Sequence, residues 1–451
     1  MLFSTDKQTL EDLNIFGRHG ADAVYNIFNR CSTRGGAAIL EDMFRRPLSD
    51  SDAINRRIGI IRYFTEKQVD FPLESGLFDA IEPYLDNVDE RTRLLPQEDS
   101  VARKLSNMIA MDAETAAIHK GIIALVSLLK RITAFINSPE ITGFELYRPD
   151  REEITALLSE PALELVLRED DKAKLPHAVM AQYDAVFRFR YRESMRKLLH
   201  YVYLLDVYLA VARVARDRNF VFPLALPAGN QGLKLEGVYH PLIKNAIPNS
   251  VQITQENNVV FLTGANMAGK STFMKSLSIA LLLAHMGFPV AAAEMQFHVL
   301  DGIYTTINLP DNLGMGASHF YAEVLRLKKI AHELGQGKRL FIVFDELFRG
   351  TNVKDAFEAT IAVASAFATK RDSIFIISTH IIEAGSVLAE KCRNIYFLYL
   401  PTRMNGTQPV YTYMLKEGIT DDRHGMVIVN NEKILEMLEA GLHPEVIKTT
   451  V

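Results

Sequence analysis

The segment Gly264–Ser271, with the sequence GANMAGKS, decides the fold class of the second half of this chain. It fits the pattern GxxxxGK[ST], follows the apolar run VVFLT (259–263) and precedes the helical sequence STFMKSLSIALLLAHM (271–286). A glycine-rich turn between a strand and a helix points backbone N–H groups and the positive end of the helix dipole at a phosphate. The pattern therefore predicts a phosphate-binding loop within an α/β fold.

Each part of this loop has an expected role. Lys270 would reach the β- and γ-phosphates of a nucleotide, and the hydroxyl of Ser271 would bind Mg²⁺, a hard cation that prefers oxygen ligands. The alternative is a chance glycine-rich start of a helix, which the flanking strand and helix argue against. The predicted nucleotide-binding residues of this segment are Gly264, Ala265, Asn266, Met267, Ala268, Gly269, Lys270, Ser271 and Thr272.

Two more apolar runs end in polar residues. LFIVF (340–344) leads into Asp345 and Glu346, and SIFIIS (373–378) leads into Thr379 and His380. Strands buried on both faces belong to parallel sheets, whose carboxyl ends form the ligand-binding edge. We expect Asp345 to hold Mg²⁺, Glu346 to act as general base and His380 to sense the γ-phosphate. The alternatives are a helix cap for the acidic pair and a structural role for the histidine.

The pattern of apolar, proline and glycine residues divides the chain into three parts. Apolar positions recur every three or four residues up to about residue 225, as expected for helices. Proline and glycine then gather in FVFPLALPAGNQGLKLEG (220–237), where this periodicity stops. We predict an all-helical domain over 1–230, an α/β domain over 231–430 and a helical tail over 431–451.

Composition limits the function classes. The 451 residues are 48% hydrophobic and 23% charged, which is typical of a globular protein with two or three cores. Cys31 and Cys392 lie far apart and outside any metal-ligand spacing, so they suggest neither a disulfide framework nor a zinc site. Without a signal peptide or a run of eighteen apolar residues, we expect a cytoplasmic protein with no membrane partner. The net charge of −5 means that any DNA contact needs a local basic surface.

At this point the motifs resemble those of one family, the MutS mismatch-repair ATPases. The phosphate loop GANMAGKST, with its Asn266–Met267 pair, the acidic segment DELFRGTN (345–352) and the segment STHIIE (378–383) are similar to that family in order and spacing. The resemblance implies an ABC-type P-loop NTPase domain behind a helical core and lever domain, with ATP and Mg²⁺ as ligands.

Two further segments carry the resemblance into the rest of the ATPase half. LPDNLGMGASHFYAEVLRL (309–327) is similar to the family signature segment, which implies that Ser318 contacts the γ-phosphate of ATP bound to a second subunit. ATP would then lie between two copies of a homodimer. VYHPLI (238–243) resembles the segment that borders the nucleotide, which makes His240 a predicted binding residue.

The helical half also resembles the family over 9–64 and 204–223, but the chain departs from the pattern in places. Phe348 stands where the family usually has glycine, and the aromatic residue expected to stack on adenine is replaced near Ala246 or Ile247. Because the sequence begins at the helical core, we expect the mismatch-reading and connector domains to be absent and the DNA clamp to be reduced.

The resemblance implies an ATP-dependent DNA-binding protein, in mismatch repair or a related DNA transaction. An ATP-switched interaction protein that does not bind DNA is the alternative, and the absence of an LSGGQ-like segment disfavours a transporter ATPase. The basic stretch VFRFRYRESMRK (186–197) has two interpretations: a track for DNA phosphates or, as we favour, a solvated helix face with aromatic residues in the core.

Overall fold

The computed structural model describes residues 3–17, 22–96, 108–167, 175–227, 232–307, 319–405, 408–420 and 433–440. The chain forms two compact units. Residues Met1–Ile27, Phe44–Ile58 and Arg218–Val451 make up the sheet unit, and residues Phe28–Met43 and Gly59–Asp217 make up the helical unit. This division differs from the predicted boundary at residue 230, because two early segments pack with the sheet unit. Helical periodicity shows which face of a helix is buried but not what covers it.

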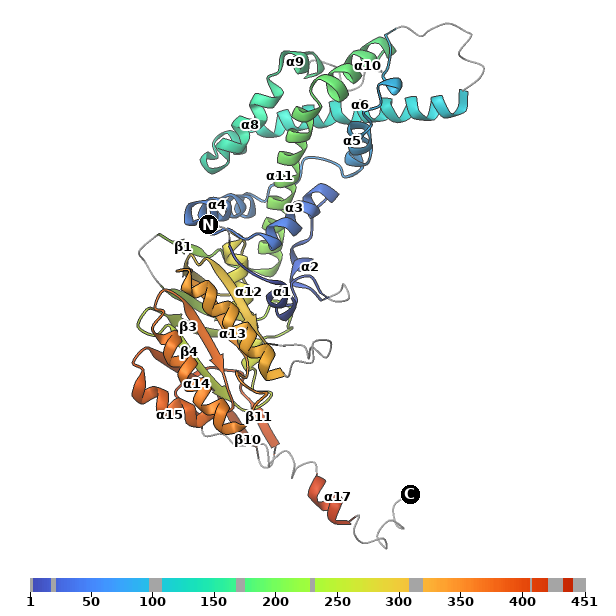
Figure 1. Ribbon diagram of the computed structural model, residues 1–451. Coiled ribbons are helices and arrows are strands. Elements are labelled where there is room, and N and C mark those ends of the chain that lie inside the picture. Colours follow the sequence, from blue (N-terminus) through green and yellow to red (C-terminus); the bar gives the residue numbers. More distant parts are fainter. Residues whose placement is uncertain are drawn as a thin grey trace. The chain divides into compact units, whose positions relative to one another are not determined.

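The described part of the helical unit consists of helices, as the sequence predicts (Figure 1). Its two longest helices, α6 (Met108–Ile136) and α11 (Arg192–Arg218), are the ones with the most extended apolar periodicity. By length and composition α11 could cross a membrane, but most of its apolar stretch is buried, as in the core helix of a globular protein. The other elements of the first half are α1 (Lys7–Asp12), α2 (Val24–Phe28), α3 (Arg34–Arg45), α4 (Ser51–Lys67), α5 (Gly76–Asp86), η1 (Glu90–Thr92), α7 (Pro139–Thr142), η2 (Glu145–Tyr147), α8 (Arg148–Leu158), α9 (Pro161–Leu167), α10 (His177–Asp184) and η3 (Ala185–Arg190).

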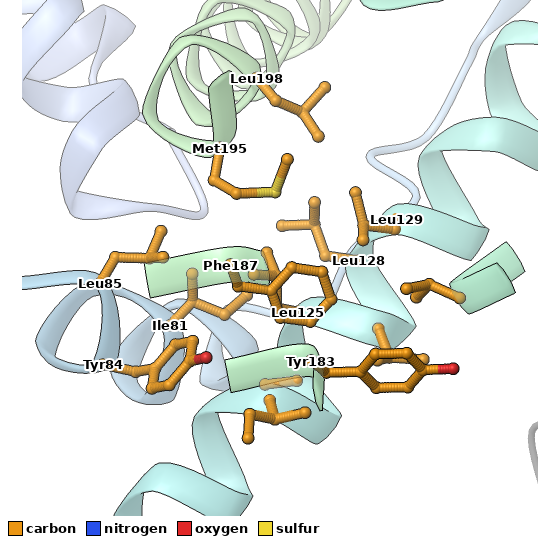
Figure 2. Packing of buried hydrophobic residues seen from close by; sticks show 14 of the residues in the cluster. Ile81, Tyr84, Leu85, Leu125, Leu128, Leu129, Tyr183, Phe187, Met195 and Leu198 are labelled. Carbon is orange, nitrogen blue, oxygen red and sulfur yellow. The ribbon is translucent and has the colours of Figure 1, made fainter. Parts of the chain in front are cut away.

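One hydrophobic cluster holds the helical unit together (Figure 2). Leu125, Leu128 and Leu129 project from α6 at helical spacing and are fully buried. Ile81 of α5 and Met195 of α11, also fully buried, belong to the same cluster. The aromatic rings of this cluster are therefore packing residues of the core.

The basic stretch 186–197 lies mostly in ion pairs and hydrogen bonds of the helical unit. Arg188 is fully buried: its Nε and Nη2 donate to the two carboxylate oxygens of Asp184, each at 2.6 Å, and its Nη1 donates to Thr92 Oγ1 at 2.9 Å. Arg196 pairs with Asp86, and Lys197 pairs with Glu153. Phe187 lies in the core, as the favoured interpretation predicts, but Arg188 is buried as well and does not lie on a solvated helix face.

The sheet unit is built around a six-stranded sheet of order β12-β9-β4-β8-β7-β6. Strands β4, β7 and β8 are buried at every position and run parallel, as their uninterrupted apolar sequences predict. Their carboxyl ends therefore meet at one edge of the sheet. The strands are β4 (Val259–Gly264), β6 (Gly302–Thr306), β7 (Leu340–Phe344), β8 (Ile374–Ser378), β9 (Ile395–Leu400) and β12 (Lys416–Glu417), of which β12 alone is antiparallel to its neighbour.

Further elements complete the sheet unit. A second sheet has the order β1-β5-β2-β3, and β10 pairs with β11 as a hairpin. The helices are α12 (Lys270–His285), α13 (His319–Gly335), α14 (Val353–Ala368), α15 (Ile382–Lys391) and α17 (Ile434–Ala440), and the remaining strands are β1 (Leu224–Leu226), β2 (Leu233–Val238), β3 (Asn249–Ile253), β5 (Glu294–His298), β10 (Thr402–Asn405) and β11 (Gln408–Tyr411). Helix α17 lies in the predicted helical tail.

Candidate functional site

The predicted phosphate loop connects the end of β4 to the start of α12. Gly264 and Gly269 both have positive φ, at +144° and +103°, which glycine adopts without a steric penalty. At Gly264 an added Cβ would lie 3.0 Å from Leu400 O, so the loop approaches β9 too closely for a side chain. Lys270 and Ser271 form the first turn of α12, where backbone N–H groups point out of the helix.

Lys270 is the buried cation of this loop. Its side-chain amine donates to the backbone oxygens of Gly264 at 2.8 Å and Ala265 at 3.2 Å, and the residue is 6% exposed. Burial lowers the pKa of Lys270, while the charges of Asp345 and Glu346 oppose that shift. A buried ammonium group that donates to neutral carbonyls favours a nearby anion, because an opposite charge offsets its lost hydration.

Ser271 and Asp345 bring two oxygen ligands together. Asp345 follows β7, and its Oδ2 accepts a hydrogen bond of 2.5 Å from Ser271 Oγ. A hydroxyl and a carboxylate are the oxygen donors that Mg²⁺ binds, and this ion usually completes its octahedron with water and phosphate oxygens. The predicted pair therefore fits a magnesium ion, although the described residues contain no cluster of three metal-binding side chains.

Glu346 is held between two side chains. His380 Nε2 lies 2.8 Å from Glu346 Oε1, and Arg349 Nη1 lies 3.2 Å from Glu346 Oε2. Glu346 has a φ of +57°, so its backbone is in the left-handed region that non-glycine residues seldom occupy. The structure thus brings His380 into contact with Glu346, a contact that sequence reasoning did not predict, and adds Arg349, which it did not single out.

The structure accommodates Phe348 at a position where the family usually has glycine. Its φ is +65°, a conformation that glycine adopts at no cost, and its side chain is 4% exposed. The Phe348 ring lies 5.9 Å from that of Phe320 in the first turn of α13, between ring centroids. Burial of the ring offsets part of the backbone strain.

A pocket of about 390 Å³ adjoins the phosphate loop, and its lining includes His240, Ala246, Ile247, Gly269 and Tyr413. Burial, with a smaller effect of Lys275, lowers the pKa of His240 to about 4, so the imidazole is neutral at neutral pH. A larger open groove of about 1030 Å³ lies between α14 and α15 and contains no predicted site residue. The smaller pocket is the candidate site because it adjoins the residues that carry the chemistry.

Tyr413 is a residue of this pocket that sequence reasoning missed. A Cβ added at Gly269 would lie 3.0 Å from Tyr413 Cδ1, so the ring lies directly beside the phosphate loop. Asn249 holds the backbone here, since its Nδ2 donates to Tyr413 O at 2.9 Å and its Oδ1 accepts from Leu415 N at 2.7 Å. Tyr413 thus places an aromatic ring, from a distant part of the chain, in the pocket that Ala246 and Ile247 also line.

We predict that Tyr413→Ala weakens ATP binding about tenfold, because stacking of a base on an aromatic ring contributes about 1–3 kcal/mol. Tyr413→Phe, which keeps the ring, should bind ATP normally. Titrations of both variants with a fluorescent ATP analogue measure the difference, and inorganic tripolyphosphate, which lacks a base, serves as the control ligand. Equal weakening for ATP and tripolyphosphate would assign Tyr413 to the loop and not to the base.

Ser318 lies outside the described residues, and Phe320 and Glu323 of the same segment lie in α13. Lys270, Ser271, Asp345, Glu346 and His380 meet at the carboxyl edge of the six-stranded sheet. Met267 is exposed at 75% and points away from the protein interior.

Comparison with known proteins gives consistent results for both halves of the chain. A family model described as MutS domain III matches residues 8–212, and one described as MutS domain V matches residues 260–439. The DNA mismatch repair protein MutS of Staphylococcus haemolyticus is 26% identical over 59% of this chain and 30% of its own length. That of Fusobacterium nucleatum is 28% identical over 55% of this chain and 29% of its own length. These alignments thus span under a third of the relatives.

Proposed function

The chain belongs to the MutS family, and on that premise we propose that it is an ABC-type P-loop ATPase. It hydrolyses MgATP between two copies of itself. Hydrolysis controls the binding of the protein to DNA in the cytoplasm. The observation that carries this proposal is the convergence of Lys270, Ser271, Asp345, Glu346 and His380 beside a pocket of nucleotide size. Domain V, which the second family model matches, is the ATPase domain of MutS proteins.

The proposed reaction is attack of water on the γ-phosphorus. A P–O bond forms to the water oxygen, the bond to the β,γ-bridging oxygen breaks, and Glu346 accepts the proton from water. His380 and Arg349 hold the Glu346 carboxylate from either side, which keeps it aimed at one position. Lys270 stabilises negative charge on the phosphates, and a magnesium ion at Ser271 and Asp345 would neutralise further phosphate charge.

Two exposed apolar side chains support a second copy as partner. Met267 in the phosphate loop is 75% exposed, and Val353, at the start of α14 just after the acidic segment, is 77% exposed. A second copy packed over this face would remove both side chains from water, which is favourable. The second copy would also supply Ser318, whose segment resembles the family signature.

The basic stretch 186–197 does not support binding to DNA, because its residues Arg188, Arg196 and Lys197 already pair with carboxylates. That observation favours the alternative, an ATP-switched protein that binds another protein and not DNA.

ATPase rates and gel shifts with plain, mismatched and branched duplexes, at two salt concentrations, separate these functions. We expect DNA to stimulate hydrolysis and the affinity to fall as salt rises, because phosphate contacts release counterions. If the chain hydrolyses ATP but no duplex binds or stimulates it at low salt, the interaction protein becomes the correct account.

A further inference from the structure

Tyr413 lies in the candidate pocket in a backbone conformation that its own side chain does not favour. Its φ is +55°, in the left-handed region that residues with large side chains seldom adopt. The residue is 45% exposed, and a Cβ added at Gly269 in the phosphate loop would lie 3.0 Å from Tyr413 Cδ1. Contacts from the surrounding chain must therefore keep the backbone of Tyr413 in this conformation.

Asn249, the first residue of β3, supplies two of those contacts from a distant part of the sequence. Its Nδ2 donates to Tyr413 O at 2.9 Å, and its Oδ1 accepts from Leu415 N at 2.7 Å. Thr412 Oγ1, just before the tyrosine, donates to Pro401 O at 3.0 Å. The segment 413–415 is thus bonded to β3 through the side chain of Asn249.

The same amide also bonds to a second segment of the pocket lining. Asn249 Nδ2 donates to Ile247 O at 3.3 Å, a longer bond than the one to Tyr413 O. Ile247 and Tyr413 both line the pocket. A primary amide has two N–H donors and an oxygen acceptor, so Asn249 can satisfy two carbonyls and one N–H with a single group. One side chain therefore ties the backbone of Ile247 to the backbone of Tyr413.

We propose that Asn249 is a positioning residue for the base of the nucleotide. It holds Tyr413 where the ring stacks on the base, and it sets the space between that ring and Ile247. Asn249 acts through Tyr413, because its three side-chain bonds go to backbone atoms of the protein. This inference rests on the proposed function, since it needs ATP in this pocket.

The Asn249→Leu variant tests this role, because leucine has a similar branched shape but no charge and no hydrogen-bonding atom. We expect the Kd and the KM for ATP to rise about tenfold, as for loss of the Tyr413 ring, with little change in kcat. The Kd for inorganic tripolyphosphate, which has no base, should stay the same. An unchanged Kd for ATP, or equal weakening for both ligands, would overturn the proposal.

The matched control is Asn257→Leu, beyond the other end of β3. The Asn257 amide also donates to a backbone oxygen, that of Gln252 at 3.1 Å, but it does not line the pocket. This variant should bind ATP and tripolyphosphate as the wild type does. If Asn249→Leu does not fold, Asn249→Ala replaces it, because alanine removes the same three bonds.

A double variant separates action through Tyr413 from an independent effect. If Asn249 acts through the ring, Asn249→Leu should weaken ATP binding less than about twofold further once Tyr413→Ala has removed the ring. If the two losses add, to about 100-fold in the double variant, Asn249 contributes independently of Tyr413 and the proposal is wrong.

Fluorescence gives a direct view of the ring. The sequence contains no tryptophan, so Tyr413→Trp places a single indole in the pocket. We expect ATP to quench its fluorescence by stacking, whereas tripolyphosphate should not. With Asn249→Leu added, saturating ATP should quench much less. Quenching of the same size would show that the ring keeps its place without Asn249, against the proposal.

The same titrations distinguish failure of this inference from failure of the proposed function. If Tyr413→Ala weakens ATP binding but Asn249→Leu does not, the role of Asn249 is wrong and the proposed ATPase stands. If Tyr413→Ala binds ATP as the wild type does, the base does not stack on this ring and the inference is wrong. If the wild type binds neither ATP nor tripolyphosphate, the proposed function is wrong and the role of Asn249 falls with it.

Discussion

Glu346→Gln is expected to lower the rate of ATP hydrolysis about 10²–10⁴-fold, the range by which a general base contributes, while ATP still binds. Glutamine keeps the size of the side chain and an oxygen that can accept the hydrogen bond from His380, but it cannot take a proton from water. Steady-state phosphate release measures the loss, and equilibrium binding of labelled ATP shows that the pocket survives.

The matched control is Glu358→Gln on α14, a glutamate that lines the open groove between α14 and α15. It should hydrolyse ATP at the wild-type rate. Wild-type turnover by Glu346→Gln would mean that another group activates the water, and the placement of Glu346 between His380 and Arg349 would then be structural.

Lys270→Ala is expected to weaken ATP binding about 100-fold, because a hydrogen bond to a charged group contributes about 1.5–3 kcal/mol and the charge itself is lost as well. The folded protein without nucleotide should not be destabilised by much, since Lys270 is a buried cation that bonds to neutral carbonyls. Thermal unfolding with and without MgATP measures both effects in one experiment.

For the wild type, ATP at 100 times its Kd should add about 2.7 kcal/mol to the free energy of unfolding, and at the same ATP concentration a Kd weakened about 100-fold should leave an increment of only about 0.4 kcal/mol in Lys270→Ala. Lys391→Ala, at the end of α15, keeps the phosphate loop intact and should retain the increment. If MgATP raised the free energy of unfolding of Lys270→Ala by the full increment of about 2.7 kcal/mol, the phosphate loop would not be the ATP-binding site.

The parts of the site that sequence predicts well are those with a local pattern. β4, β7 and β8 are short apolar runs, and each ends in polar residues, so their burial and their common edge follow from the parallel-sheet geometry. The conformation of Gly264 and Gly269 follows in the same way from the glycine-rich turn. These elements needed no knowledge of distant contacts.

The parts that sequence does not predict depend on contacts between distant segments. Tyr413 reaches the phosphate loop from more than a hundred residues away, and only the close approach to Gly269 reveals it. The residues before Ile27 read as the start of a helical domain, yet they pack with the sheet unit, where Asp12 bonds to Thr305. Neither Tyr413 nor the segment before Ile27 lies in a motif or a spacing pattern that identifies the residues it contacts.

The central claim is that one MgATP is held at the edge of the sheet and that a second copy completes its pocket. Sedimentation of Glu346→Gln with MgATP and a fluorescent ATP analogue tests it most directly, because bound nucleotide accumulates when hydrolysis stops. We predict a dimer that carries one nucleotide per chain, and a return to monomer when Ser318→Ala is added to the same chain. Nucleotide bound to a monomer, or a dimer that forms equally well without nucleotide, would contradict the claim.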